Sequence, residues 1–510
     1  MNRPVVSLLA MTALLAGGAG VARALPGSPP RGATAALARA EAGKAPVELA
    51  QAVCPGGVDS NATTSVSALG GIDDAAASSR RDAGSSSLTV RTVSGSTLGS
   101  STRAGAPLDV GGTRRGPLVF TATGSMAPGL AAGTLSQVGS GAARGLSGAA
   151  CLPAGTDFWF VGPGTGVGAR PSVYLTNPTD APAVVDVNLY GPDGPLQSPS
   201  ALGLAVAAHT QKILELDAVV PDVAHLAVHV VVSQGRVAAA VRDLQVNGLD
   251  AQGADWVPLS VPPSRSVVIP LSPGGGGARE LSIVDPGTGD ATVAVRAVGA
   301  AGSFVPVGAE SLTVPAGGVL TVDASQFAGP TLENLAIVLS SDTPVTAGLL
   351  ARRSGRSSRL ADLAWSSAAA ALEGPATVPI VMLGPDWVVE LMLFSPKRAS
   401  AVRLQTRLAS GAVSTRTVEL PADVLVTVRL GPPPGVPRSG PTQAAVVLTP
   451  TGSARVFGAA MLTETTPSGP LFSITPLVSG TFQVAVPQVR RDLAAGVRAG
   501  LRAGQSLSSP

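Results

Sequence analysis

The chain has 510 residues, of which 45% are apolar and only 13% are charged, and its formal net charge is +3. Average chains are about 25% charged, so this composition excludes a disordered polyelectrolyte, and it provides no clustered basic surface for nucleic acid. The 62 glycines and 44 prolines instead indicate many short apolar strands joined by tight turns, in a chain long enough for three to five domains.

Residues 1–24 have the pattern of a secretory signal peptide. Asn2-Arg3 supplies a short positive region, residues 5–16 are apolar, and Ala22-Arg23-Ala24 matches an A-x-A cleavage site. A membrane-spanning helix needs about 20 apolar residues, a length reached only if residues 17–22 are included. We therefore expect a secreted or cell-envelope-associated protein, with an uncleaved N-terminal anchor as the alternative.

Residues 25–46 are rich in Pro, Gly and Ala and predict a linker, with a removed propeptide as the alternative. Residues 47–152 predict a degenerate β-domain, because residues 118–121 resemble a strand whereas most of the segment is Ser, Gly and Ala. The two cysteines of the chain, Cys54 and Cys151, flank this segment.

An exported chain with two cysteines predicts one disulfide between Cys54 and Cys151; two unpaired small apolar side chains are the alternative. The bond would close a loop of about 97 residues and stabilise the chain by roughly 4–5 kcal/mol on the chain-entropy model. We expect Cα atoms within about 7 Å, and a bond that ties the weak domain to its neighbour.

From residue 153 onward the sequence repeats about every 110 residues. Strand-like runs end at Pro178, Pro286 and Pro396, and an alternating segment follows each proline. The apolar members of these segments are Val185, Val187 and Leu189, then Val293, Val295 and Ala297, then Val402 and Leu404. Period-2 alternation predicts strands with one face on a core and one face in water.

The second half of each repeat contains a strand ending near Asp217, Asp323 or Arg429, followed by two apolar runs. We expect the two runs of each repeat to pair across a turn: 226–232 with 237–241, 335–339 with 345–349, and 445–448 with 456–460. Two tryptophans, Trp256 and Trp365, occupy equivalent positions, and Trp387 is matched with Trp159.

Each repeat has the size and strand spacing of an antiparallel β-sandwich of the immunoglobulin or fibronectin III kind. The predicted fold is therefore all-β, with tandem sandwiches at 153–268, 269–377 and 378–486 arranged like beads on a string. A closed propeller is the competing arrangement, but propeller repeats are usually about 40–50 residues. The tail at 487–510 predicts a frayed amphipathic end, with a partner-binding helix as the alternative.

Several runs resemble a known family. They are Cys151-Leu-Pro153, Phe158–Gly162, Leu175–Pro178, Ala183–Val187 and Tyr190–Gly194. Together they resemble a secreted actinobacterial family of uncharacterised proteins, domain of unknown function 5719, most strongly over residues 150–245. The resemblance implies export and an exterior array of β-domains, and it brings no catalytic residues with it.

Motifs that suggest chemistry are few. The histidines His209, His225 and His229 lack enough nearby ligands for a zinc site, which needs three or four. The Gly-rich stretch 162–168 lacks the Lys-Ser/Thr of a phosphate loop and predicts a flexible hairpin loop. Asp285 and Asp290 flank a turn that only faintly resembles a calcium loop, and no G-x-S-x-G elbow is present.

We therefore predict no catalytic, cofactor-binding or metal-binding residues, and a non-enzymatic envelope protein with a structural or interaction role. A cell-wall glycan-binding module is the alternative, and an envelope hydrolase is a weaker one. Expected partners are cell-wall polysaccharide or another envelope protein, without nucleic acid, and with membrane contact only through an uncleaved N-terminal segment. Most of the tryptophans and tyrosines fall at strand positions that predict core, so one exposed Trp beside a groove would favour the glycan reading.

Overall fold

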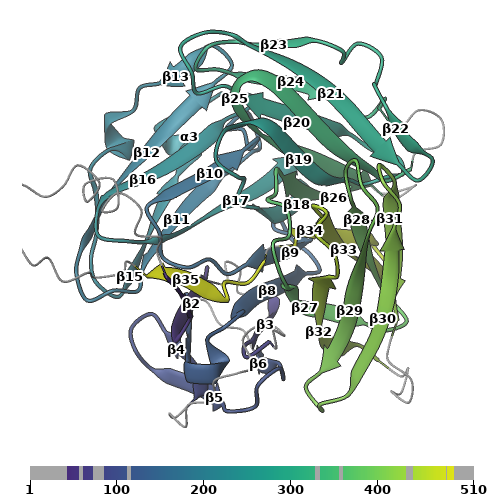
Figure 1. Ribbon diagram of the computed structural model, residues 1–510. Coiled ribbons are helices and arrows are strands. Elements are labelled where there is room, and N and C mark those ends of the chain that lie inside the picture. The colour runs from purple at the N-terminus through teal and green to yellow at the C-terminus, as the bar shows by residue number, and fades with distance from the viewer. Residues whose placement is uncertain are drawn as a thin grey trace, which may run out of the picture. The chain divides into compact units, whose positions relative to one another are not determined.

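The computed structural model describes residues 43–56, 61–72, 86–111, 116–327, 333–354, 360–431, 440–477 and 479–486 (Figure 1). The predicted signal peptide, nearly all of the linker and the tail from 487 lie outside these residues. The regular secondary structure of the described part is almost entirely antiparallel β-strand, so the predicted all-β class is confirmed, while the immunoglobulin or fibronectin likeness stays a prediction. In this part, no helix has the length and apolar character that crossing a membrane requires.

The contacts divide the chain into two units. In the smaller unit, β1 (Gly43–Pro46) pairs with β35 (Gln483–Val486). The larger unit, residues 46–482, contains four two-sheet sandwiches, named I to IV in chain order.

Sandwich I has a first sheet of β2 (Leu49–Cys54), β7 (Leu118–Thr123), β4 (Ser87–Thr92) and β5 (Thr97–Ser101). Its second sheet is β6 (Leu108–Gly111), β3 (Thr63–Leu69), β8 (Ala131–Val138) and β9 (Gly145–Ala150), and the short turn η1 (Gly124–Met126) precedes β8.

Sandwich II has a first sheet of β10 (Asp157–Val161), β16 (Ala227–Gln234), β12 (Ala183–Gly191), β13 (Gly194–Leu196) and β14 (Leu204–Val206). Its second sheet is β15 (Thr210–Glu215), β11 (Ser172–Asn177), β17 (Ala238–Asn247) and β18 (Asp250–Val257). Two helical turns, η2 (Pro199–Ala201) and α3 (Leu216–Val219), complete it.

Sandwich III has a first sheet of β19 (Ser264–Ser272), β25 (Leu335–Ser354), β21 (Ala291–Gly299), β22 (Gly302–Phe304) and β23 (Leu312–Val314). Its second sheet is β24 (Val319–Asp323), β20 (Arg279–Val284), the other half of β25, and β26 (Ala361–Ser367).

Sandwich IV has a first sheet of β27 (Ala376–Leu383), β32 (Thr442–Pro450), β29 (Ser400–Leu408) and β30 (Val413–Leu420). Its second sheet is β31 (Leu425–Leu430), β28 (Trp387–Phe394), β33 (Phe457–Thr466) and β34 (Gly469–Pro476).

The alternating segments behave as their period predicts. In β12, Val185, Val187 and Leu189 are buried, whereas Asp186 and Asn188 between them are only half-buried. The equivalent strands β21 and β29 bury their matching apolar residues in the same way. A strand whose apolar side chains all point to one face buries that face against the opposite sheet.

The predicted pairing of the two apolar runs in each repeat is wrong. In sandwich II, β16 pairs with β10 and β12 in the first sheet, whereas β17 pairs with β11 and β18 in the second. Gly235, at a φ of 77°, lies where the chain crosses between the sheets. In sandwich III the two runs form the continuous strand β25, which contributes to both sheets. Both runs line one core from opposite sides, so they cannot also be hairpin partners.

The tryptophan correspondences are half right. Trp256 and Trp365 occupy the same register, opposite Arg242 and Leu350 on the neighbouring strands. Trp387 does not correspond to Trp159, because Trp159 lies on the first strand of its sandwich and Trp387 on the second, in the other sheet. The local similarity of the two short sequences was misleading.

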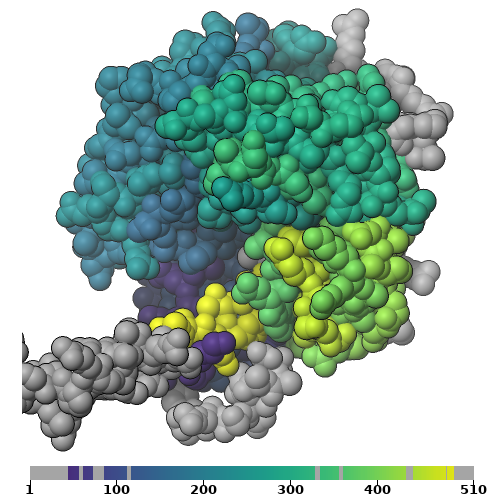
Figure 2. Space-filling view, turned by 45° about the horizontal axis from the view of Figure 1, so that its top comes forward, coloured from purple at the N-terminus to yellow at the C-terminus, as the bar shows by residue number. Residues whose placement is uncertain are grey.

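The beads-on-a-string arrangement is wrong for residues 46–482, because the sandwiches share apolar cores. One cluster joins the core of III to Phe394, Phe457 and Phe472 of IV, and Figure 2 shows the surfaces of III and IV running into each other without a break. Another joins the core of II to Trp365 of III, and a third joins IV to Leu146 of I. Apolar residues that a separate bead would expose are therefore buried between sandwiches.

The edge strands β9, β18, β26 and β34, the last strand of each sandwich, form a closed cycle of contacts. Each contacts the next, and β34 contacts β9. A sheet edge presents unpaired main-chain groups, which a protein must cover or blunt. This cycle places four such edges against one another inside the protein.

Cys54 and Cys151 form the predicted disulfide, with Cα atoms 4.3 Å apart. Both lie in the buried cluster of sandwich I that includes Phe120 and Met126. Cys54 ends β2 in the first sheet, and Cys151 follows β9 in the second. The bond therefore joins the two sheets of sandwich I, which corrects the expectation that it ties this domain to the next.

Candidate functional site

Two buried carboxylates, Asp255 of β18 and Asp362 of β26, connect the edge strands. Asp255 accepts hydrogen bonds from the main-chain N–H of Gly148 (3.0 Å) and from the Ser473 hydroxyl (3.1 Å to Oδ2). Because Gly148 belongs to sandwich I and Ser473 to IV, this single side chain of sandwich II joins three sandwiches. We call the set formed by Asp255, Asp362 and their partners the aspartate hub.

Asp362 does the same from sandwich III. Its Oδ2 accepts from the N–H groups of Leu146 (3.3 Å) and Phe472 (2.8 Å), and its Oδ1 accepts from that of Leu363 (3.0 Å). Within their own sheets β9 and β34 are edge strands, so the N–H groups of Leu146 and Phe472 have no ladder partner on that side. The Asp362 carboxylate accepts the hydrogen bonds that a neighbouring strand would otherwise accept from these two N–H groups.

A buried arginine and a serine complete the hub. Arg144 donates to the carbonyl oxygens of Ala361 in sandwich III and of Ser468 and Gly469 in sandwich IV, at 3.1–3.2 Å. Ser147 donates to the carbonyl of Ala254 in sandwich II at 2.7 Å. All four sandwiches are thus held through side-chain contacts to fixed main-chain groups.

The electrostatics of the hub are dominated by burial. Burial raises the pKa of both Asp255 and Asp362 well above the usual carboxyl value, and the main-chain donors act in the opposite direction. The negative charge of Asp362 also raises the pKa of Asp255, while Arg144 lowers that of Asp362. Donors of this kind satisfy a buried carboxylate whose isolation would otherwise be costly.

A groove lies at the junction of sandwiches II and III. One cavity of 370 Å³ is lined by the Gly-rich loop 162–168, the hairpin of β17 and β18, and Glu280, Leu350 and Arg352 of III. A second cavity of 400 Å³ is lined by Pro192, Pro315 and β24. Both cavities are lined by His225 and Glu280, so they adjoin at these residues, and we call the pair the junction groove.

Two glycines allow the sandwiches to approach closely here. A Cβ atom at Gly162, whose φ is 118°, would lie 2.3 Å from a ring carbon of Trp365. A Cβ at Gly348 would lie 2.1 Å from the carbonyl oxygen of Val161. Only a residue without a side chain fits these positions, so the Gly-rich loop is a packing element.

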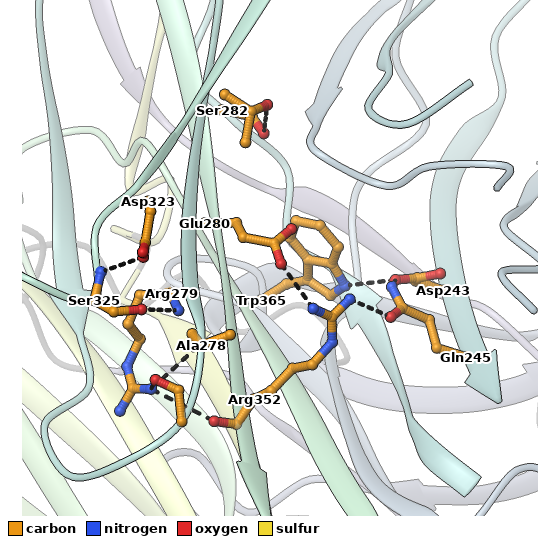
Figure 3. Close-up of polar contacts among 12 residues, drawn as sticks. Asp243, Gln245, Ala278, Arg279, Glu280, Ser282, Asp323, Ser325, Arg352 and Trp365 are labelled. Carbon is orange, nitrogen blue, oxygen red and sulfur yellow. Dashed lines mark hydrogen bonds and ion pairs between the residues drawn. The ribbon is translucent and has the colours of Figure 1, made fainter. Parts of the chain in front are cut away.

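A chain of hydrogen bonds fixes the polar wall of the groove (Figure 3). Trp365 Nε1 and Gln245 Nε2 both donate to Asp243 Oδ2, at 3.3 and 2.6 Å. Arg352 donates to Gln245 Oε1 and, at 2.7 Å, to Glu280 Oε1. Asp243 is fully buried, and burial raises its pKa to about 6 against the lowering effect of Gln245 and Arg352.

The profile of the Family of unknown function (DUF5719) matches residues 93–431. The chain belongs to this family. The matched segment contains sandwiches II and III whole, and with them the junction groove and both hub aspartates. No curated protein matches the chain.

One solved structure is described as the crystal structure of a tetra-tandem repeat in the extending region of a large adhesion protein. It is 11% identical to this chain and covers 78% of this chain and 91% of its own, with a TM-score of 0.09. At that score the two do not superpose, so the likeness supports neither fold nor function.

The three histidines of this DUF5719 chain lie in three different environments. His209 is exposed and lies 2.8 Å from Asp180. His229 stacks on Trp159 at 3.9 Å between ring centroids and lies 3.3 Å from Asp157; burial lowers its pKa, and Asp157 opposes that shift. His225 lines the junction groove. Among the described residues, no group of three or more His, Cys, Asp or Glu side chains is placed to hold a metal ion.

The remaining motifs have structural roles. The Gly-rich loop 162–168 joins β10 and β11, which lie in opposite sheets, so it is a crossover loop and the predicted hairpin is wrong. Asp285 accepts from the N–H of Gly287 and Asp290 from that of Ala316, as turn residues do.

The tryptophans offer no exposed platform. Trp159, Trp256 and Trp365 are each at most 4% exposed, and Trp387 is half-buried. Trp159 packs with Val284 and Val319 at the junction of II and III. An exposed Trp beside a groove, which would have favoured a glycan-binding module, is therefore not found at any of the four positions.

Sequence reasoning did not find the hub or the wall of the groove. Asp362 is the single charge in β26, and Asp255 is the single charge in Gly253–Val257, the second half of β18, where the other residues are apolar or small. An isolated charge in such a strand signals a buried carboxylate that needs specific partners. The signal locates the residue but cannot name partners more than 100 positions away.

Proposed function

We propose that this protein is exported and serves the cell envelope in a non-enzymatic structural or interaction role. Its sandwiches act as one rigid scaffold that presents grooves and loops to another envelope component. The observation that carries the proposal is the aspartate hub, in which Asp255, Asp362 and Arg144 use buried charge to hold four sandwiches together. A chain built only to space two ends apart would need no such cross-links.

The disulfide supports an extracytoplasmic site, since such bonds persist in oxidising compartments. The charged groups support a role without catalysis. In the described part of the chain, Arg352 is held by Glu280 and Gln245, and the hub carboxylates are held by main-chain donors. Groups engaged in this way serve as fixed contacts.

Export is tested by labelling intact cells with a membrane-impermeant amine reagent. Lys397 is exposed in a turn and is a suitable target. Labelling before lysis is expected; labelling only after lysis would contradict an envelope location.

The interaction role is tested by binding of fluorescent full-length protein to isolated envelopes. Saturable binding that unlabelled protein competes away is expected. Linear, uncompeted adsorption would contradict the proposal, and turnover in a panel of wall, ester and peptide substrates would replace it with an envelope hydrolase.

Cell-wall glycan is the second candidate partner. The observation that favours it is the wall of the junction groove, where a carboxylate, a guanidinium and amides lie together. Such mixed hydrogen-bonding groups suit a hydroxyl-rich ligand.

A further inference from the structure

We propose that the junction groove binds a neutral, hydroxyl-rich segment of a polysaccharide. This inference rests on the proposed interaction role and names its site and ligand class. The extent of the lining is the first argument. Its two cavities share His225 and Glu280, so a chain-like ligand that passes these residues can contact the linings of both.

The polar wall is fixed before any ligand arrives. Arg352 holds one oxygen of Glu280, and Arg352 is in turn held by Gln245, which is anchored on buried Asp243. Groups locked in this way lose little freedom when a ligand binds, which preserves affinity. Glu280 Oε2 has no hydrogen bond within the described residues and is available to accept from a hydroxyl.

The balance of charge points to a neutral ligand. Arg352 is paired with Glu280, and the second cavity adds a carboxylate, Asp323, on the strand directly opposite Glu280. An anionic polymer would meet these carboxylates, and a cationic one would meet the guanidinium of Arg352. A sugar hydroxyl both donates and accepts, so it can satisfy the carboxylate and the guanidinium in turn.

A neutral amide and apolar surface complete the lining. Asn247 contributes the amide at one end, and Pro192, Pro315 and Val319 contribute apolar surface at the other. A pyranose ring presents the same combination, with hydroxyls around its rim and C–H groups on its faces.

A peptide has little strand edge to pair with in this groove. Peptides that add to a sheet need an unpaired strand edge; β20, which carries Glu280, is paired with β24 on one side and β25 on the other, and the edge at the second cavity is that of the five-residue strand β24. No aromatic ring lies among the lining residues of either cavity apart from the imidazole of His225. Without a stacking platform we expect weak single-site affinity, about 0.1–1 mM.

The test uses neutral wall polysaccharide from the producing bacterium, freed of protein and separated from acidic polysaccharide by anion exchange. Retention of the full-length protein on the immobilised neutral fraction is measured, with the acidic fraction and wall peptides as separate arms. Gly166→Leu is the decisive variant, because Gly166 lines the groove and an added Cβ meets no atom within 4 Å. Its matched control is Gly289→Leu, which also has open space and lies outside the groove.

We expect retention on the neutral fraction, reduced at least about 5-fold by Gly166→Leu and unchanged in its control. Arg352→Gln should weaken retention similarly, whereas Arg403→Gln, at an exposed site on β29, should not. Absent retention, equal retention by Gly166→Leu, or retention only by acidic polysaccharide or peptide would overturn the inference. Saturable binding to whole envelopes without binding to neutral polysaccharide would overturn it while leaving the proposed function standing.

Discussion

Removing the Asp362 side chain should weaken three sandwiches at once. Asp362→Ala leaves the N–H groups of Leu146, Phe472 and Leu363 without their acceptor, at positions where the donor–acceptor distances are now 2.8–3.3 Å. Each buried unpaired donor costs about 1–3 kcal/mol. Loss of the burial penalty of the carboxylate itself offsets part of this, so we expect a decrease in unfolding free energy of about 3–6 kcal/mol.

Urea denaturation followed by circular dichroism measures the decrease, and hydrogen exchange locates it. Faster exchange is expected in β9 of sandwich I and β34 of sandwich IV as well as in β26. The control is Asp193→Ala, at an exposed turn, which should change stability by less than about 0.5 kcal/mol. A cost below about 1 kcal/mol, or exchange changes confined to sandwich III, would refute the view that Asp362 links the sandwiches.

Three further outcomes are expected. Reduction of Cys54–Cys151 should first speed proteolysis and hydrogen exchange of residues 54–151, while the later sandwiches stay folded. The reason is that closing this loop stabilises the folded state by roughly 4–5 kcal/mol. Uniform resistance to protease with and without reductant would contradict this expectation. Because burial raises the pKa of Asp243 to about 6, the folded state binds its proton more tightly than the unfolded state does. The contribution of Asp243 to the free energy of unfolding therefore falls as pH rises from about 4 to 6, by about 3 kcal/mol at most, and is then constant. In urea titrations at several pH values, Asp243→Asn should reduce the decrease in unfolding free energy between pH 4 and 6. An unchanged decrease in the variant would contradict this role of Asp243. Gly162→Ala should cost about 2 kcal/mol or more in urea denaturation because its Cβ would collide with an indole ring, whereas Gly166→Ala should be within about 0.5 kcal/mol of wild type; equal effects would show that the close approach is unimportant.

The faces of strands could be predicted because they depend on local alternation. Val185, Val187 and Leu189 are buried for the reason their spacing indicates, since a strand has only two faces and one must cover a core. The strand partners of the two apolar runs in each repeat could not be predicted in the same way. Alternation indicates which face of a strand is buried, but it does not indicate which strand pairs with it. Nothing local distinguishes a hairpin at 234–238 from a crossing between sheets.

The hub and the groove wall were out of reach for a different reason. Their contacts join residues far apart in the chain: Gly148 with Asp255 across 107 positions, and Leu146 with Asp362 across 216. Such contacts form only where separate sandwiches pack against one another, and a beads-on-a-string arrangement contains no such packing. The disulfide was predictable because only one pairing of two cysteines exists, yet its role within one sandwich depended on where β9 lies.

Hydrogen exchange of three amides in the unmodified protein tests the central claim that the sandwiches form one body around the hub. The N–H groups of Leu146, Gly148 and Phe472 belong to edge strands and point to Asp255 or Asp362 of neighbouring sandwiches. We expect them to exchange as slowly as amides in central strands, and at least about 100-fold more slowly than free-edge amides of β30. Exchange as fast as that of β30 would mean that these edges are open to water and that the sandwiches are not held together.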